Sequence, residues 1–151
     1  MVEDYQVSIV LVDDDEDDRN FFTRAVHNTS PAIRFVALGD GEKFMEFLEN
    51  DPVPRPDLVI LDINMPGLSG LDCLKQLRQS SGWSDLPVVM YSTSTQEKDL
   101  NDSTQLGANL YVVKPKEISA LYRLVNYLVN LDWSRRKPFA QNILFKDPSI
   151  S

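Results

Sequence analysis

The chain has 151 residues, of which 42% are hydrophobic and 25% are charged, and its formal net charge is −8 at pH 7. This length and balance indicate a globular domain with a sizeable core, and the acidic excess disfavours direct binding to nucleic acid or to an anionic membrane. A single cysteine, Cys73, excludes a disulfide framework within one chain. We expect a cytoplasmic protein, because residues 1–12 lack the basic and apolar parts of a signal peptide.

Five short apolar runs, each bounded by turn-forming residues, predict β-strands. They are Val7–Val12, Ile33–Leu38, Leu58–Leu61, Val88–Tyr91 and Leu110–Val113. Apolar residues at helical spacing follow each run and predict five helices, with stripes at Phe21, Phe22, Ala25 and Val26; Phe44, Phe47 and Leu48; Leu71, Leu74 and Leu77; Leu100 and Leu106; and Ile118, Leu121, Val125 and Leu128. Five alternating strand–helix units indicate an α/β fold with a doubly wound parallel sheet covered by helices on both faces.

The first predicted strand leads directly into six acidic residues at positions 13–18. Clustered carboxylates repel one another unless a cation lies among them, and open α/β sheets bind ligands at the carboxyl ends of their strands. Asp13 and Asp14 therefore predict a site for a hard cation such as Mg²⁺. The other four acids, positions 15–18, suit the cap and first turn of the next helix. A calcium EF-hand loop does not fit, because Asp18 and Arg24 stand where that loop needs glycine and glutamate.

The residues that follow the strands meet at one edge of such a sheet. They are Asp13 and Asp14 after the first strand, Asp62 after the third, Ser92 and Thr93 after the fourth, and Lys114 after the fifth. Carboxylates with a metal ion can hold phosphate oxygens, a hydroxyl can donate to one oxygen, and an ammonium group can neutralise another. A carboxylate beside the metal can also act as a nucleophile and form an aspartyl phosphate.

Four segments, in this order and at these intervals, resemble the receiver domain of two-component response regulators. They are Val10–Asp14, Pro56–Pro66, Pro87–Ser92 and Tyr111–Pro115. The resemblance covers roughly residues 7–133. It implies a flavodoxin-like strand order 2-1-3-4-5 with five helices in a three-layer sandwich. It further implies a receiver domain at residues 1–134 and a C-terminal tail at 135–151, with no output domain expected.

The resemblance implies a role for each residue that would meet the phosphoryl group. Asp62 would accept phosphate from a phosphohistidine donor, Ser92 would hydrogen-bond the phosphoryl group, and Lys114 would pair with it. Tyr111 would be the aromatic side chain whose rotamer reports the state of Ser92. The family usually has threonine at the position of Ser92, and serine keeps the hydroxyl but is less stiff at χ1.

The resemblance also implies a metal-ligand set for Mg²⁺. Asp14, Asp62 and the backbone carbonyl of Asn64 would bind the ion, and Asp13 would act largely through a bound water. Asn64 lies two residues past the phosphoacceptor, at a position that tunes dephosphorylation in the family.

We therefore expect a receiver that a sensor histidine kinase or phosphotransfer protein phosphorylates on Asp62, and that signals through contacts with a downstream protein. We expect no enzyme activity beyond self-catalysed phosphotransfer and autodephosphorylation. The last helix has apolar residues off its main stripe, which leaves open either a broad buried face or a homodimer through that helix or the tail; these residues are Tyr122, Leu124 and Leu131.

Three alternative functions remain at this point. The first is a receiver-like interaction scaffold that is never phosphorylated. The second is an aspartyl-phosphate phosphatase, but such enzymes place an acid two residues after the nucleophile, where this chain has Asn64. The third is a flavin-binding module, but the acids after the first strand would repel the flavin phosphate.

Overall fold

The computed structural model describes residues 6–133 and 144–145, which form a parallel sheet with helices on both faces. The strands are β1 (Val7–Val12), β2 (Ile33–Leu38), β3 (Leu58–Asp62), β4 (Val88–Ser92), β5 (Leu110–Val113) and β6 (Leu144–Phe145). The helices are α1 (Glu16–Thr29), α2 (Gly41–Glu49), α3 (Gly70–Gln79), α4 (Glu97–Gln105) and α5 (Ile118–Val129). The strands lie in the order β2-β1-β3-β4-β5-β6.

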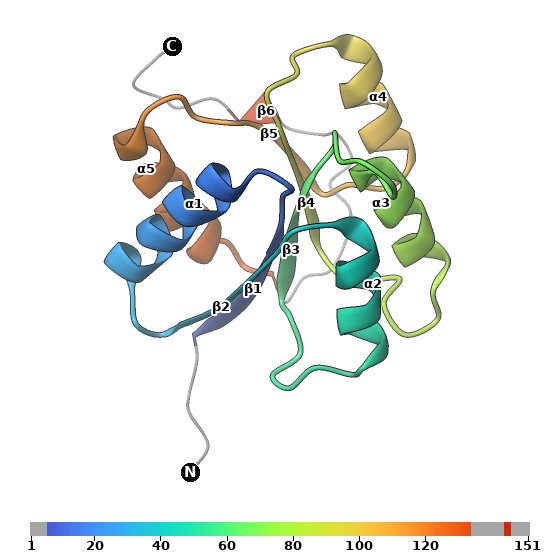
Figure 1. Cartoon of the computed structure of the whole chain (residues 1–151), viewed down its shortest axis with the longest axis horizontal. Coiled ribbons are helices and arrows are strands. Elements are labelled where there is room, and N and C mark those ends of the chain that lie inside the picture. Colours follow the sequence, from blue (N-terminus) through green and yellow to red (C-terminus); the bar gives the residue numbers. More distant parts are fainter. Residues whose placement is uncertain (1–5, 134–143, 146–151) are drawn as a thin grey trace.

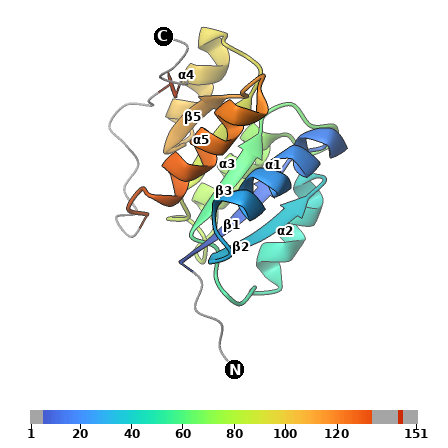
Figure 2. The same cartoon turned by 90° about the vertical axis from the view of Figure 1, so that its left-hand side faces the viewer.

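The sheet separates two hydrophobic cores. Helices α1 and α5 cover one face, while α2, α3 and α4 cover the other (Figure 1). Turned by 90°, α1 and α5 lie side by side in front of the strands (Figure 2). Every residue of β1, β3 and β4 is buried, as expected for central parallel strands whose side chains point alternately into the two cores.

The predicted α/β fold and its strand order 2-1-3-4-5 are confirmed. Strands β1, β2 and β5 have the predicted bounds, whereas β3 and β4 each extend by one residue, to Asp62 and Ser92. The sheet also has a strand that the sequence did not predict. Leu144 and Phe145 of β6 pair in parallel with Tyr111 and Val112 on the outer edge of β5, so part of the predicted tail joins the sheet.

Helix α5 buries a broad face within the chain. Leu124 is fully buried, and Tyr122 and Leu131 pack partly buried against the core between α1, α5 and the sheet. Of the extra apolar residues, Leu124 therefore belongs to the core, while Tyr122, and Leu131 just beyond the end of α5, pack against it. Ile118 and Tyr127 of the helix stay 41% and 37% exposed. In the part of the chain that the structure describes, no helix has the length and apolar character needed to cross a membrane.

Candidate functional site

Backbone pairing places three charged side chains at the carboxyl edge of the sheet. Asp13 directly follows β1, and its N–H donates to the carbonyl of Leu38 at 3.0 Å. Asp62 is the last residue of β3. Lys114 directly follows β5, and its N–H donates to the carbonyl of Ser92 at 2.8 Å. The sheet ladder therefore continues through these positions and holds their side chains close together.

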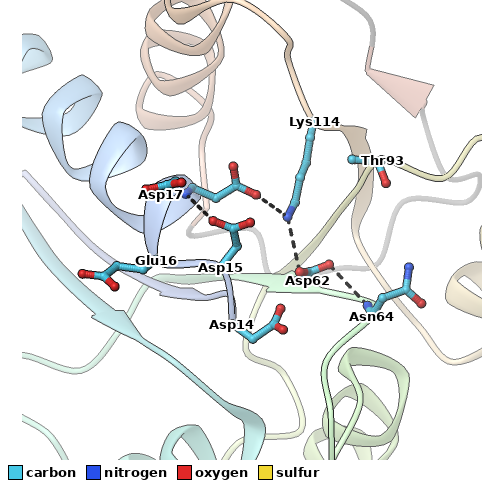
Figure 3. Close-up of a pocket in the computed structure, with 9 residues that line it drawn as sticks. Asp14, Asp15, Glu16, Asp17, Asp62, Asn64, Thr93 and Lys114 are labelled. Atoms are coloured by element: carbon cyan, nitrogen blue, oxygen red, sulfur yellow. Dashed lines mark hydrogen bonds and ion pairs between the residues drawn. The ribbon is translucent and has the colours of Figure 1, made fainter.

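The ammonium group of Lys114 is shared among three carboxylates. Its Nζ lies 2.9 Å from Asp13 Oδ2, 2.9 Å from Asp18 Oδ2 and 3.3 Å from Asp62 Oδ2; the contact with Asp62 is drawn in Figure 3. Burial opposes the charged ammonium, yet the hydrogen bonds to Asp18 and Asp13 raise the pKa of Lys114 above its ordinary value. Lys114 therefore stays charged, but one positive charge faces three acids.

The Asp62 carboxylate is buried in a site that opposes its ionisation. Burial raises its pKa from 3.8 to about 7, and the charge of Asp13 adds to this rise, while Lys114 acts in the opposite direction. The backbone N–H of Asn64 donates to Asp62 Oδ1 at 3.3 Å and also favours the ionised form. A second positive charge at this site would stabilise the carboxylate in its nucleophilic form.

The loop after β3 holds Asp62 against the start of α3. The N–H of Gly70 donates to the carbonyl of Ile63 at 3.0 Å, and a Cβ at Gly70 would collide with the carbonyl oxygen of Asp62. Only glycine permits this close approach. The capping box of Ser69 and Asp72 then starts α3 directly beside the site.

The acids meet the requirements of a divalent-cation site. Asp13, Asp14 and Asp62 each offer an oxygen, and these oxygens all lie within 4.8 Å of one another. Asp14 is exposed, while Asp13 and Asp62 are buried, so the group has one open side. The residues around a hollow of about 610 Å³ at this side include Asp14, Asp62, Asn64, Thr93 and Lys114 (Figure 3). Oxygen ligands with an open side for water and phosphate suit Mg²⁺.

The hydroxyl groups of Ser92, the last residue of β4, and of Thr93 point to different surroundings. Ser92 is buried, and its Oγ accepts a hydrogen bond from the N–H of Ser94 at 3.1 Å. Thr93 is exposed and lines the hollow. Tyr111 is buried with its hydroxyl donating to the carbonyl of Ser94 at 2.9 Å. Tyr111 thus bonds the carbonyl of Ser94 and Ser92 bonds its N–H. These two hydrogen bonds connect β5 to the end of β4.

The sequence assigned Asp18 only to the first turn of α1, and the structure adds a second contact. Asp15 caps α1 as expected, because its side chain accepts from the N–H of Asp18 at 3.1 Å. The carboxylate of Asp18 nevertheless bonds Lys114. This contact joins residues 96 positions apart, so only the three-dimensional arrangement reveals it.

Comparison with known proteins agrees with this geometry. Residues 9–126 match the family described as response regulator receiver domain. The chain is 31% identical over 121 residues to Response regulator Rcp1 of Synechocystis sp. (strain ATCC 27184 / PCC 6803 / Kazusa), an alignment that covers 78% of this chain and 82% of Rcp1.

Solved structures of relatives have the same fold. The Mn²⁺-bound form of Rcp1 superposes with a TM-score of 0.72 at 28% identity, over 81% of this chain and 91% of that chain. The phosphorylated cyanobacterial phytochrome response regulator RcpA superposes with a TM-score of 0.74 at 30% identity, over 81% of this chain and 90% of that chain. The chain therefore belongs to the response regulator receiver domain family of two-component signalling.

Proposed function

We propose that the protein is a phosphoacceptor receiver in which Asp62 takes a phosphoryl group from a phosphohistidine donor. The observation that carries this proposal is the contact of Lys114 with both Asp13 and Asp62 at the closed side of the acidic group. A nucleophilic carboxylate, a fixed cation and an open acidic hollow are the parts that phosphoryl transfer requires.

In the transfer step, an oxygen of Asp62 attacks the phosphorus atom of the donor. The P–N bond of phosphohistidine breaks, and its electron pair returns to the imidazole. Lys114 binds a phosphoryl oxygen through its ammonium group, and the hydroxyl of Ser92, whose oxygen accepts from the N–H of Ser94, donates its hydrogen to another phosphoryl oxygen. Hydrolysis later breaks the P–O bond and regenerates the carboxylate.

We propose Mg²⁺ as the cation held by Asp13, Asp14 and Asp62, with the carbonyl of Asn64 as a further ligand. When bound, the ion supplies positive charge that holds Asp62 ionised and binds a phosphoryl oxygen. The mutual reach of the three carboxylates and the raised pKa of Asp62 support this assignment. The Mn²⁺ in the Rcp1 structure is a divalent ion of similar preference for oxygen ligands.

Labelling with acetyl phosphate and Mg²⁺ tests the proposal. We expect the full chain to gain one phosphoryl group that is stable in acid but released by base or hydroxylamine, as for an acyl phosphate. Asp62→Asn abolishes the label. Full labelling of that variant would exclude Asp62 as the phosphoacceptor.

The residue just before β3 offers a matched control. Asp57 directly precedes β3, at the opposite end of the sheet, and its Oδ2 accepts from the N–H of Ser8 at 2.8 Å. Asparagine keeps a side-chain oxygen that can accept this bond. Asp57→Asn therefore retains the label, which separates the loss of the phosphoacceptor from the loss of any acid at the ends of β3.

The expected partners are a sensor histidine kinase or phosphotransfer protein as donor and a downstream protein as receiver of the signal, in the cytoplasm. The charge of −8 argues against nucleic acid as the direct target. The same labelling experiment separates phosphotransfer from the scaffold alternative, which predicts no label. A generic phosphomonoester that stays intact in the presence of the protein would exclude the phosphatase alternative.

A further inference from the structure

We propose that Asp18 is a positioning residue that holds the ammonium group of Lys114 and competes with the incoming phosphoryl group for it. This inference rests on the proposed phosphorylation of Asp62. It assigns Asp18 a role in setting how readily the site accepts a phosphoryl group, beyond its place in the first turn of α1.

The starting point is the number of donors on Lys114. An ammonium group has three N–H donors, and Lys114 has carboxylate oxygens of Asp13, Asp18 and Asp62 within 3.3 Å. Every donor is therefore engaged before a phosphoryl group arrives. A phosphoryl oxygen can accept a hydrogen bond from Lys114 only if one of these carboxylates loses its contact with the ammonium group.

Among the three carboxylates, Asp18 is the one whose contact with Lys114 costs the least free energy to break. The side chain of Asp13 is fully buried and that of Asp62 is 7% exposed, whereas that of Asp18 is 36% exposed. Asp13 also accepts from the N–H of Asp15 through its other oxygen, at 3.0 Å. Of the two carboxylates that are not themselves phosphorylated, only Asp18 can exchange Lys114 for water without leaving a buried charge unpaired.

The local structure explains why Asp18 faces Lys114 and not its own helix. Asp18 is the third residue of α1, as Asp72 is of α3. In α3 this carboxylate reaches back to the N–H of the cap residue, Ser69, at 3.2 Å. In α1 the equivalent N–H, of Asp15, is already bonded to Asp13, so Asp18 has no cap partner to reach and is free to bond Lys114.

The surroundings leave room for Asp18 to move. Asp18 and Lys114 line the hollow above the acids, and both also line a second hollow of about 260 Å³ bounded by Phe21 and Ile118. Rotation of the Asp18 side chain away from Lys114 therefore needs no displacement of core residues.

The test compares Asp18→Asn with a matched control, Asp17→Asn. Asp17 lines the same hollow and carries the same charge, but it is not among the carboxylates that pair with Lys114. Both variants remove one negative charge from the first turn of α1, so their difference isolates the contact with Lys114. Asp18→Glu is the conservative variant, because it keeps a carboxylate with longer reach.

Two measurements report the competition in the full chain. The first is the affinity for beryllofluoride with Mg²⁺, which mimics the phosphoryl group without a chemical step. The second is the rate of phosphorylation by phosphoramidate, in which the Asp62 O–P bond forms, the P–N bond breaks and the nitrogen leaves as ammonia after protonation by solvent. We expect both to rise about fivefold in Asp18→Asn relative to Asp17→Asn, the ratio that a partly exposed ion pair supports.

The outcomes separate this inference from the proposed function. Asp18→Glu is expected to stay within about twofold of the unmodified chain, because the ion pair with Lys114 is kept. Equal gains in Asp18→Asn and Asp17→Asn would mean that Asp18 acts only through its general field, and a loss in Asp18→Asn would mean that it supports the transfer; either result overturns the competition. If the unmodified chain takes up neither beryllofluoride nor phosphate, the proposed function itself fails, and this inference with it.

Discussion

The two ends of strand β5 each hold a partly buried cation, and the two cations are satisfied in opposite ways. At the amino end, Arg78 of α3 donates to the carbonyls of Gly107 and Leu86 and to the side-chain oxygen of Asn109, at 2.7–3.1 Å. All of these acceptors are neutral. At the carboxyl end, Lys114 faces three carboxylates.

The difference separates a structural anchor from a site that is short of positive charge. The planar guanidinium of Arg78 donates to several fixed acceptors at once and so ties α3 to the segments that precede β4 and β5. The carboxyl end, by contrast, concentrates negative charge that one ammonium does not balance. We therefore expect ligands to complete the charge balance at that end, where open α/β sheets bind their ligands.

The largest effect is expected from the open side of the acidic group. Asp14→Ala removes the exposed carboxylate of the three that lie within 4.8 Å of one another. We expect Mg²⁺ binding, measured by calorimetry, and labelling by acetyl phosphate to be lost together. Asp17→Ala is the control, because Asp17 is an exposed acid that lines the same hollow. Unchanged Mg²⁺ affinity in Asp14→Ala would show that Asp14 does not bind the ion and acts only as an acid near the start of α1.

The two cations provide the next test. Lys114→Ala is expected to slow phosphoryl transfer at least about tenfold, because a phosphoryl oxygen loses its cation. It is expected to lower the free energy of unfolding less than Arg78→Ala does, because Asp62, whose pKa is already raised to about 7, can take up a proton when the ammonium is gone. Arg78→Ala is expected to lower the free energy of unfolding by about 2 kcal/mol, because buried carbonyls lose their donor, with labelling of the folded protein unchanged. Chemical denaturation and labelling are measured on both variants.

Two controls sharpen this pair. Lys116→Ala removes an exposed lysine two residues from Lys114 and is expected to change neither quantity. Arg78→Lys keeps the charge but not the fork, and should recover only part of the lost stability. If Lys114→Ala lowered stability as much as Arg78→Ala with labelling intact, both ends of β5 would be structural.

The sequence predicted the sheet well because its strands are nearly continuous apolar runs. The bounds of β3 and β4 differed by one residue, since Asp62 and Ser92 are polar side chains that still take part in strand pairing. Strand β6 was not predicted, because a pairing of two residues on the edge of β5 depends on where the chain returns and leaves no periodic signal of its own.

The site was predictable to the extent that topology determines it. Residues at strand ends converge in any sheet of this order, which brought Asp13, Asp62 and Lys114 together as expected. The pairing of Asp18 with Lys114 was not predictable, because it requires that Asp13 already occupies the N–H of Asp15. Such competition between hydrogen-bond partners appears only in three dimensions.

A smaller effect is expected in the pH dependence of stability. The pKa of Asp62 is about 7 in the folded protein against 3.8 ordinarily, so between these values the folded state holds a proton that the unfolded state lacks. The contribution of Asp62 to the free energy of unfolding therefore falls as pH rises from about 4 to about 7. In EDTA at pH 8, we expect Asp62→Asn to unfold at a higher temperature than the unmodified chain, and at pH 4 to unfold at nearly the same temperature.

Magnesium supplies the control for this pH effect. At pH 8 it should raise the melting temperature of the unmodified chain, since the cation neutralises the acids, and raise that of Asp62→Asn less. A melting temperature of the unmodified chain that rises steadily from pH 4 to pH 8 in EDTA would contradict the raised pKa.

The smallest effect is expected in self-association, because the structure uses most of the apolar surface of α5 within one chain. Among the large apolar residues of this helix, only Ile118 and Tyr127 are exposed, and β6 already pairs with the outer edge of β5. We still expect a weak homodimer through α5 or the tail, strengthened by beryllofluoride and weakened by Tyr127→Lys or by ending the chain at Trp133. Val53→Lys is the control, because Val53 is 91% exposed and lies outside α5. Sedimentation that remains monomeric at high micromolar concentration, with and without beryllofluoride, would exclude the dimer and leave a different protein as the partner of this surface.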